Sequence, residues 1–562
     1  MPLRLASASL LALPASVRST LFLAALYPIY GQTAAASTSA TSTTFDVSRH
    51  QYPTMMSQSD PAEEGKPGQK AMLARQRAKE EAAASGQNVQ RGSWFPLGYK
   101  DGFSQWWAGL SPAVTEHKVL SFIPHLKQPP TQTQTGAQPP TSSDPMPIDP
   151  NKEQTQAVRT ESPSDPYGPR QWSSKLVQLS GKNRALNEFS VSKPGQEVEN
   201  NLVMLHGYGA GLGFFYKNFE PLSRLAGWQL YALDLLGMGR SSRPPFRINA
   251  KKREDQTREA ESWFIDALEE WRVKRGIDKM TLMGHSLGGY LAVCYALKYP
   301  GHLNKLILAS PVGIPEDPYA VREDIPDPET STMGNEFTQS QDDVASSGSK
   351  AKKAPPPRKM PRWLVTAWDA NISPFSLVRL SGPLGPRLVS GWTSRRFSHL
   401  PGPEAQALHD YSYSLFRQKG SGEYALTYVL APGAFARSPL IRRIQGVGRQ
   451  LISPSNDRAA SLEQKVRETG VPVVMLYGDH DWMDVKGGHD AAKMLNEQHD
   501  KNLAAASDQT ERLRENGEAK VVIIKNAGHH VYLDGCDQFN NVILDEMKGV
   551  ERTQKELAAL AT

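Results

Sequence analysis

Short apolar runs alternate with helix-like amphipathic stretches from about residue 200 onward. The runs lie at Asn201 to Leu205, Trp228 to Leu233, Met280 to Met283, Lys305 to Ala309, Val471 to Tyr477 and Lys520 to Lys525. Apolar runs of this length are typical of strands buried on both faces of a sheet. Apolar residues at helical spacing follow or separate them, as in Glu261 to Arg272 and Gln538 to Met547. This order predicts a mostly parallel, doubly wound α/β sheet.

Composition divides the chain into parts. Of its 562 residues 42 are Pro, and an apolar content of 39% is low for a wholly globular protein. We expect a leader (1–45), a disordered segment (46–91), an aromatic amphipathic arm (92–127), a disordered linker (128–169), the first part of the core (170–311), a helical cap (312–470) with a disordered insert (334–359), and the second part of the core (471–562). An insertion at the cap's position follows a core strand, at the sheet edge where ligands bind in such folds.

The composition of the predicted leader indicates import into mitochondria. Residues 1–45 contain Arg4 and Arg18, many Ser, Thr and Ala, and no Asp or Glu, which is typical of a transit peptide. Apolar runs at Leu10 to Pro14 and Leu21 to Tyr30 leave a secretory signal as the alternative, although Arg18 divides them. No run of 18 apolar residues occurs, so we expect peripheral attachment, at the inner mitochondrial membrane, and no membrane-spanning helix.

The number of cysteines and the net charge exclude several kinds of binding site. The two cysteines, Cys294 and Cys536, exclude a disulfide framework and a zinc site built on sulfur. A net charge of +6 is too small to indicate nucleic-acid binding, and no nucleic-acid-binding motif accompanies it. We therefore expect no metal, no cofactor and no nucleic-acid partner.

Two stretches suggest contact with a lipid surface. The arm gathers large apolar side chains at Trp94, Phe95, Phe103, Trp106, Trp107, Leu110, Val114, Leu120, Phe122 and Ile123. It is either a helical arm packed over the core or an interfacial segment whose tryptophans lie among lipid headgroups. The second stretch, Ser376 to Gln450, has ten Lys or Arg against three Asp or Glu. It is either a solvated basic face or a surface that attracts anionic headgroups.

The candidate nucleophile is Ser286. The segment Gly-His-Ser-Leu-Gly, residues 284–288, follows an apolar run and precedes a helical pattern. Strand, tight turn and helix are the context of a nucleophile elbow, in which side chains at the two glycines would collide. The backbone N–H groups of Leu287, after the serine, and of Tyr208, after an earlier strand, are the expected oxyanion donors.

A serine nucleophile needs a base that is held by a third group. Asp481 follows the Val471 to Tyr477 run, and His529 follows the last apolar run, so nucleophile, acid and base come in the chain order expected for such sheets. Asp479 and Asp484 are the alternative acids. The neighbouring His530 is expected to point away from the site.

These residues also resemble one subfamily of α/β-hydrolases. The resemblance lies in the stretches HGYGAGLGFFYKNFEPL, YALDLLGMGRSSRP, FIDALEEWR, GHSLGGYLAVCYALKYP, SPFSLVRLSGPLGPRLVSG and AGHHVYLDG. The subfamily contains the N-acyl phosphatidylethanolamine lipase, the lipid-droplet co-activator of triglyceride lipase and the fungal mitochondrial cardiolipin-specific deacylase. The resemblance implies an α/β-hydrolase fold with a helical cap inserted between the later core strands, a lipid acyl ester substrate and, for the fungal branch, a mitochondrial membrane.

We therefore expect a serine-dependent phospholipid acyl hydrolase at a membrane surface, with cardiolipin as the best guess. Two alternatives remain. His529 to Asp534 fits the His-x-x-x-x-Asp pattern of glycerolipid acyltransferases, so an acyl group on Ser286 would pass to a lysolipid, unless Asp534 only caps the last helix. The second alternative is a non-catalytic lipid-binding co-activator that uses the same fold as a scaffold. Against this, the co-activator replaces the elbow serine by asparagine, whereas this chain keeps Ser286.

Overall fold

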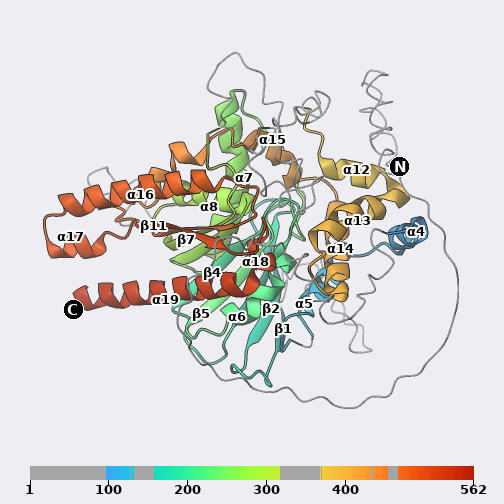
Figure 1. Cartoon of the computed structure of the whole chain (residues 1–562), viewed down its shortest axis with the longest axis horizontal. Helices are drawn as coiled ribbons and strands as arrows, with labels where there is room; N and C mark the ends of the chain where they lie inside the picture. The colour runs from blue at the N-terminus through green and yellow to red at the C-terminus, as the bar shows by residue number, and fades with distance from the viewer. Residues whose placement is uncertain are drawn as a thin grey trace, which may run out of the picture. The chain divides into compact units, whose positions relative to one another are not determined.

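One mixed sheet of nine strands forms the core of the described part of the chain (Figure 1). The computed structural model describes residues 97–126, 128–131, 157–316, 368, 370–431, 435–452 and 466–561. All of them belong to one compact unit, Ala71–Thr562. The strands are β1 (Val158–Glu161), β2 (Gln171–Gln178), β3 (Ala185–Ser192), β4 (Asn200–Leu205), β5 (Trp228–Leu233), β6 (Met280–His285), β7 (Leu303–Ala309), β10 (Val473–Gly478) and β11 (Ala519–Ile524). The predicted leader, the segment 46–91 and the insert 334–359 lie outside the described residues.

The strand order is β1-β2-β3-β5-β4-β6-β7-β10-β11. The six strands from β5 to β11 run parallel to one another, whereas the pairs β1–β2, β2–β3 and β3–β5 are antiparallel. The chain moves toward one edge of the sheet from β4 to β5 and toward the other from β6 onward. Such a reversal opens a crevice at the carboxyl ends of β4 and β6, where ligands bind in α/β sheets. The predicted doubly wound α/β fold is confirmed.

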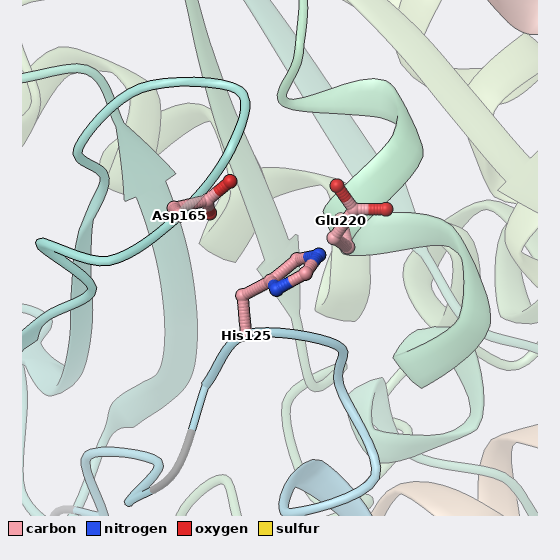
Figure 2. A group of neighbouring side chains, drawn as sticks. All are labelled: His125, Asp165 and Glu220. Carbon is pink, nitrogen blue, oxygen red and sulfur yellow. The ribbon is translucent and has the colours of Figure 1, made fainter. Parts of the chain in front are cut away.

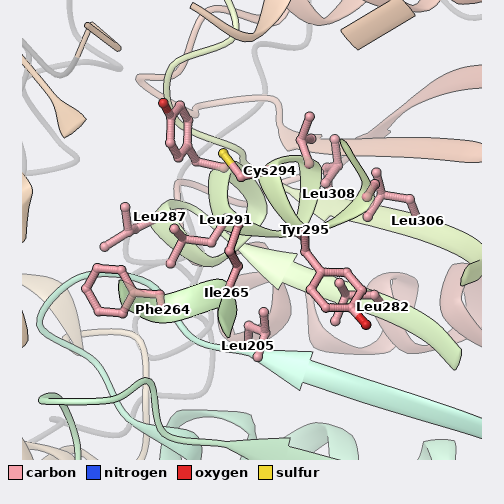
Figure 3. Close-up of a cluster of buried hydrophobic side chains, with 14 of the residues drawn as sticks. Leu205, Phe264, Ile265, Leu282, Leu287, Leu291, Cys294, Tyr295, Leu306 and Leu308 are labelled. Carbon is pink, nitrogen blue, oxygen red and sulfur yellow. The ribbon is translucent and has the colours of Figure 1, made fainter. Parts of the chain in front are cut away.

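The strands are buried on both faces because helices cover both. On β4, Val203 and Leu205 pack into one apolar cluster, while Leu202 and Met204 pack into the other. The first cluster, shown in Figure 3, joins the sheet to α7 (Arg253–Lys274), α8 (Leu287–Lys298) and α16 (Val485–Ala505). The second joins it to α5 (Pro112–Leu120), α6 (Tyr216–Leu222), α18 (Val531–Asp534) and α19 (Cys536–Ala561). This two-sided burial explains why the core strands read as apolar runs.

The structure corrects one boundary, because part of the predicted linker 128–169 belongs to the sheet. Residues 158–161 form β1, which pairs antiparallel with β2. The strand is four residues long and reads Val-Arg-Thr-Glu, so it carries no apolar run that a pattern search detects. Edge strands tolerate such polar sequences because one side of the ladder is open to water.

A buried arginine fixes the turn between β1 and β2. Arg170 donates from Nε to Asp165 Oδ2 (2.6 Å) and from Nη2 to Glu220 Oε1 (3.0 Å). Figure 2 shows Asp165 and Glu220 beside His125, and in the described part of the chain these three could share a cation, with ligand atoms within 4.8 Å of one another. The Arg170 guanidinium already binds both carboxylates, and Arg224 also pairs with Glu220 (2.8 Å), so this group is an ion-pair cluster that ties the turn to α6.

A helical cap lies between β7 and β10, as predicted. It contains α12 (Pro374–Leu380), η3 (Gly382–Leu384), α13 (Gly385–Arg396), α14 (Gly402–Phe416) and α15 (Leu426–Val429). Ser373 caps α12 by accepting a hydrogen bond from Phe375 N–H. The chain then returns to β10 through 435–447, whose Arg443 pairs with Glu261 of α7 (2.5 Å).

The aromatic arm folds as two helices, α4 (Tyr99–Ala108) and α5, which pack against the cap. Val119 and Leu120 of α5 are buried, and Lys118 pairs with Asp410 of α14 (2.9 Å). The packed-arm interpretation is therefore confirmed for α5. In α4, by contrast, Trp107 remains 76% exposed. Within the described residues, no helix is both long and apolar enough to cross a bilayer.

Candidate active site

Ser286 lies alone between a strand and a helix, as the elbow motif predicts. Strand β6 ends at His285, and α8 begins at Leu287. The backbone of Ser286 has φ 53° and ψ −115°, a strained conformation for a residue with a side chain. The serine as a whole is 9% exposed. Strained turns of this kind hold a nucleophile clear of the sheet.

Glycines make this turn possible through backbone contacts. A Cβ at Gly284 would lie 2.3 Å from the carbonyl oxygen of Gly288, and a Cβ at Gly288 would lie 2.6 Å from that of Leu205. A Cβ at Gly207 would come within 3.0 Å of the Ser286 Cβ. The loop after β4 therefore touches the serine directly, and neither partner can move aside without displacing the sheet.

The predicted acid and base meet at the carboxyl ends of adjacent strands. Asp481 follows β10 and His529 follows β11, and Nδ1 of His529 lies 3.2 Å from Oδ1 of Asp481. Both side chains are buried. The carboxylate also accepts a hydrogen bond from Met483 N–H (3.0 Å). Since the carboxylate can only accept, Nδ1 donates and Nε2 becomes the acceptor of the neutral imidazole.

Both alternative acids have other partners. Asp479 accepts a hydrogen bond from Ala527 N–H (3.1 Å), and Asp484 caps α16 by accepting from Lys486 N–H (3.0 Å). Asp481 is thus the carboxylate that the structure brings to the histidine. Burial raises the pKa of the Asp481 carboxyl, but His529 and the Met483 N–H outweigh this, and its pKa falls below the ordinary value.

His529 is joined to the elbow through a residue that sequence reasoning missed. His285, directly before the serine, donates from Nε2 to the carbonyl oxygen of His529 (3.0 Å), and the two ring centroids are 4.8 Å apart. Burial, with repulsion from His529, lowers the pKa of His285 well below its ordinary value, so the ring is neutral. His285 occupies a variable position of the motif, which gave no signal for this role. In the described part, His529 Nε2 is buried without a hydrogen bond, and catalytic hydrogen bonds often form only with substrate in place.

The ring of His530 lies 5.0 Å from that of His285 and 5.7 Å from that of His529 between centroids, so its expected orientation away from the site stays a prediction. Its ring packs against Phe214 (6.0 Å between centroids) and Tyr532 (5.7 Å). Burial and the nearby Arg396 lower its pKa well below the ordinary value, so it is a neutral packing residue.

The two expected oxyanion donors lie on either side of the serine. Leu287 is the first residue of α8, where backbone N–H groups have no acceptor within the helix. Tyr208 lies in the loop after β4, next to Gly207, and its ring stacks on Phe375 of α12 with centroids 5.0 Å apart. The cap therefore holds one side of this loop. The donor role of both N–H groups stays a prediction.

Asp534, the last residue of the His-x-x-x-x-Asp pattern, does not cap the last helix. Helix α19 begins at Cys536, so Gly535 precedes it and the expected cap at Asp534 is wrong. The carboxylate instead accepts a hydrogen bond from Gly528 N–H (3.0 Å), directly before His529. It also lies 3.6 Å from Arg396 and 3.3 Å from His399, both in or next to α13. Asp534 thus connects the cap to the loop that carries His529.

Comparison with known proteins adds an independent result. The model of the alpha/beta hydrolase fold family matches residues 200–535. The 1-acylglycerol-3-phosphate O-acyltransferase of Arabidopsis thaliana is 31% identical over 371 residues, which cover 65% of this chain and 70% of that protein. The human 1-acylglycerol-3-phosphate O-acyltransferase ABHD5 is 31% identical over 365 residues, 64% of this chain and 80% of the other. The human (lyso)-N-acylphosphatidylethanolamine lipase is 30% identical over 374 residues, with coverages of 66% and 84%.

Proposed function

The chain belongs to the α/β-hydrolase family, and its relatives are enzymes named for lipid substrates. From this premise we propose that it is a serine-dependent phospholipid acyl hydrolase that acts at a mitochondrial membrane. The observation that carries the proposal is the buried Asp481–His529 pair beside the strained Ser286 turn. Cardiolipin is the proposed substrate because the chain resembles the fungal mitochondrial deacylase.

The proposed reaction follows from the roles of these groups. The Ser286 hydroxyl attacks the acyl carbonyl carbon while His529 Nε2 takes its proton, and Asp481 stabilises the imidazolium that forms. The N–H groups of Leu287 and Tyr208 stabilise the oxyanion. The lysophospholipid then leaves as an alcohol with the proton from His529. Water attacks the acyl-enzyme, and its proton returns through His529 to the serine as the fatty acid leaves.

Replacing Ser286 by Ala should abolish the release of fatty acid from cardiolipin vesicles. We expect a loss of about three to six orders of magnitude in kcat, as for other triad serines. Asp479→Asn is the matched control, because this carboxylate bonds Ala527 rather than His529 and should leave turnover nearly unchanged. Full turnover by a folded Ser286→Ala protein would contradict the proposal, and binding of lipid without turnover in the wild type would favour the co-activator alternative.

Acyl transfer is the second candidate, favoured by the relatives named acyltransferases and by the His529 to Asp534 spacing. The first half of the reaction would be the same, and a lysolipid hydroxyl would replace water in the second half. Asp534 is 4% exposed and its carboxylate holds Gly528 N–H, so we propose that it positions His529 and does not itself touch the acyl group.

Asp534→Asn tests this assignment when both products are measured with lysophosphatidic acid present as acceptor. The amide weakens the attraction to Arg396, so the loop before His529 should shift and both rates should fall together, by about ten- to a hundredfold. The ratio of transferred acyl groups to free fatty acid should stay constant. A selective loss of transfer would instead make Asp534 part of an acyltransferase site.

The proposed membrane-binding surface lies where α4 meets the cap. We define it by exposed apolar side chains on four adjoining elements: Tyr99, Phe103, Trp107, Leu377, Leu380, Leu384 and Leu388. Large exposed apolar patches of this kind mark interaction sites. Charge contributes less than the sequence suggested, because five of the ten basic residues from 376 to 450 pair with carboxylates: Arg379, Arg396, Arg442, Arg443 and Arg449. Arg396 is only 11% exposed, so it adds little to a basic surface.

Phe103→Ala with Trp107→Ala should weaken flotation with cardiolipin-containing vesicles. Each large apolar side chain contributes about 1.5–3 kcal/mol when fully buried, so the double variant should bind at least about tenfold more weakly. The loss should be similar at low and high salt, since burial of apolar surface is little screened. Val273→Ala, an exposed apolar residue of α7 outside this surface, is the control. Equal binding by all three proteins would show that α4 does not contact lipid.

The proposed mitochondrial location rests on the composition of residues 1–45. A fluorescent protein placed behind these residues should appear in mitochondria. Arg4→Glu with Arg18→Glu is the control variant and should abolish the import, because transit peptides depend on basic residues. Entry of the unaltered fusion into the secretory pathway would contradict a mitochondrial site of action.

A further inference from the structure

A carboxylate of the arm reaches the core of the hydrolase. Glu116 of α5 is 1% exposed, although the arm precedes the family-matched region, residues 200–535. Its Oε1 accepts a hydrogen bond from Arg240 Nη1. Its Oε2 accepts from Asn187 Nδ2 (3.1 Å) and from Tyr411 Oη (3.3 Å). One side chain of the arm thus bonds to β3, to the loop after β5 and to α14 of the cap.

Two of these partners converge on Asp234, the first residue after β5. Asp234 accepts from Asn187 Nδ2 (2.8 Å) and from the backbone N–H of Arg240 (2.7 Å). Its other oxygen accepts from Leu212 N–H (2.7 Å). Leu212 begins the 3-10 helix η2 (Leu212–Phe215), which directly follows the loop 206–211 that carries Tyr208, so this network fixes the carboxyl end of that loop.

Tyr411 of α14, the third partner of Glu116, connects the same loop to the cap. Gly213 N–H donates to Tyr411 Oη (3.4 Å), and Cβ atoms at Gly211 and Gly213 would lie 2.4 Å and 2.9 Å from the Tyr411 side chain. The tyrosine therefore packs directly on the loop backbone. Glu116 is thus connected to two successive backbone N–H groups at the end of this loop. It reaches Leu212 N–H through Asn187 and Asp234, and Gly213 N–H through Tyr411.

Glu116 and Arg240 depend on each other in this position. Burial raises the pKa of the Glu116 carboxyl to about 7 against the opposing effect of Arg240, so the surroundings disfavour a lone carboxylate. Arg240 is 1% exposed. Removal of the carboxylate would take away the oxygen that accepts from Arg240 Nη1, which displaces neighbouring groups or draws in water.

We propose that Glu116 is a positioning residue of the esterase site, which the arm supplies to the core. It fixes Arg240, Asn187 and Tyr411, and through them the loop that presents the Tyr208 N–H to the oxyanion. The inference rests on the proposed function, because it assigns this loop to transition-state stabilisation. The arm then contributes a positioning residue to the active site, in addition to any contact with lipid.

The test uses the full chain and a soluble short-chain ester such as p-nitrophenyl butyrate, so that vesicle binding plays no part. Glu116→Ala should lower kcat by about ten- to a hundredfold with KM little changed, since a misplaced oxyanion donor acts on the transition state. Glu116→Gln retains an oxygen that can accept from Arg240 and should recover part of the loss. Asp101→Asn, at an exposed carboxylate of α4 in the same arm, should match the wild type.

Tyr411→Phe guards against misfolding of the Glu116 variants, because it removes one hydroxyl and keeps the packing. It should lower kcat in the same way, and the backbone amides of Leu212 and Gly213 should exchange hydrogen faster in every affected variant. Wild-type kcat and exchange rates in folded Glu116→Ala and Tyr411→Phe would overturn the inference. If the wild type shows no Ser286-dependent turnover, the proposed function fails, and amide exchange alone then decides whether Glu116 holds the loop.

Discussion

The backbone of Ser286 is the constraint on which the rest of the site depends. A residue with a side chain at positive φ costs on the order of 1–3 kcal/mol. Three backbone bonds hold it there: its N–H donates to Ala309 O (2.9 Å), and its carbonyl accepts from Tyr290 N–H (3.1 Å) and Val312 N–H (3.3 Å). The turn closes only because glycines let α8 lie against the end of β4. The strained turn thus lies at the end of β6, next to β4, where the strand order reverses.

Around this turn, three parts of the chain converge on two loops. The loop after β4 is held by Asp234 of the core, by Tyr411 of the cap and, at one remove, by Glu116 of the arm. The loop after β11 is held by His285 of the elbow and by Asp534, whose carboxylate faces the cap. Arm and cap are therefore structurally coupled to both sides of the serine. A lipid surface that engages α4 would contact the same body that shapes the oxyanion loop.

Sequence patterns could predict the parts that depend on local geometry. The elbow, the alternation of buried strands and the order of acid and base all follow from chain-local rules, and Asp481 was separable from Asp479 and Asp484 by its distance from the strand end. Tertiary pairing could not be read in the same way. The polar strand β1 exists through its pairing with β2, Arg396 is buried only because α13 faces Asp534, and α19 runs to Ala561, well beyond the predicted Met547. The pairing of β1 with β2 and of Arg396 with Asp534 joins separate segments of the chain, so the pattern within one segment does not show it.

The central claim is that lipid acyl groups pass through an ester on Ser286. Acid quenching of the wild-type protein during turnover of cardiolipin vesicles, followed by mass spectrometry of the peptide that contains residues 284–288, tests it most directly. The account predicts a fatty acyl group in ester linkage on Ser286, whether water or a lysolipid is the final acceptor. Release of lysolipid at full rate with this serine unmodified, under conditions where a known acyl-enzyme is trapped, would contradict it.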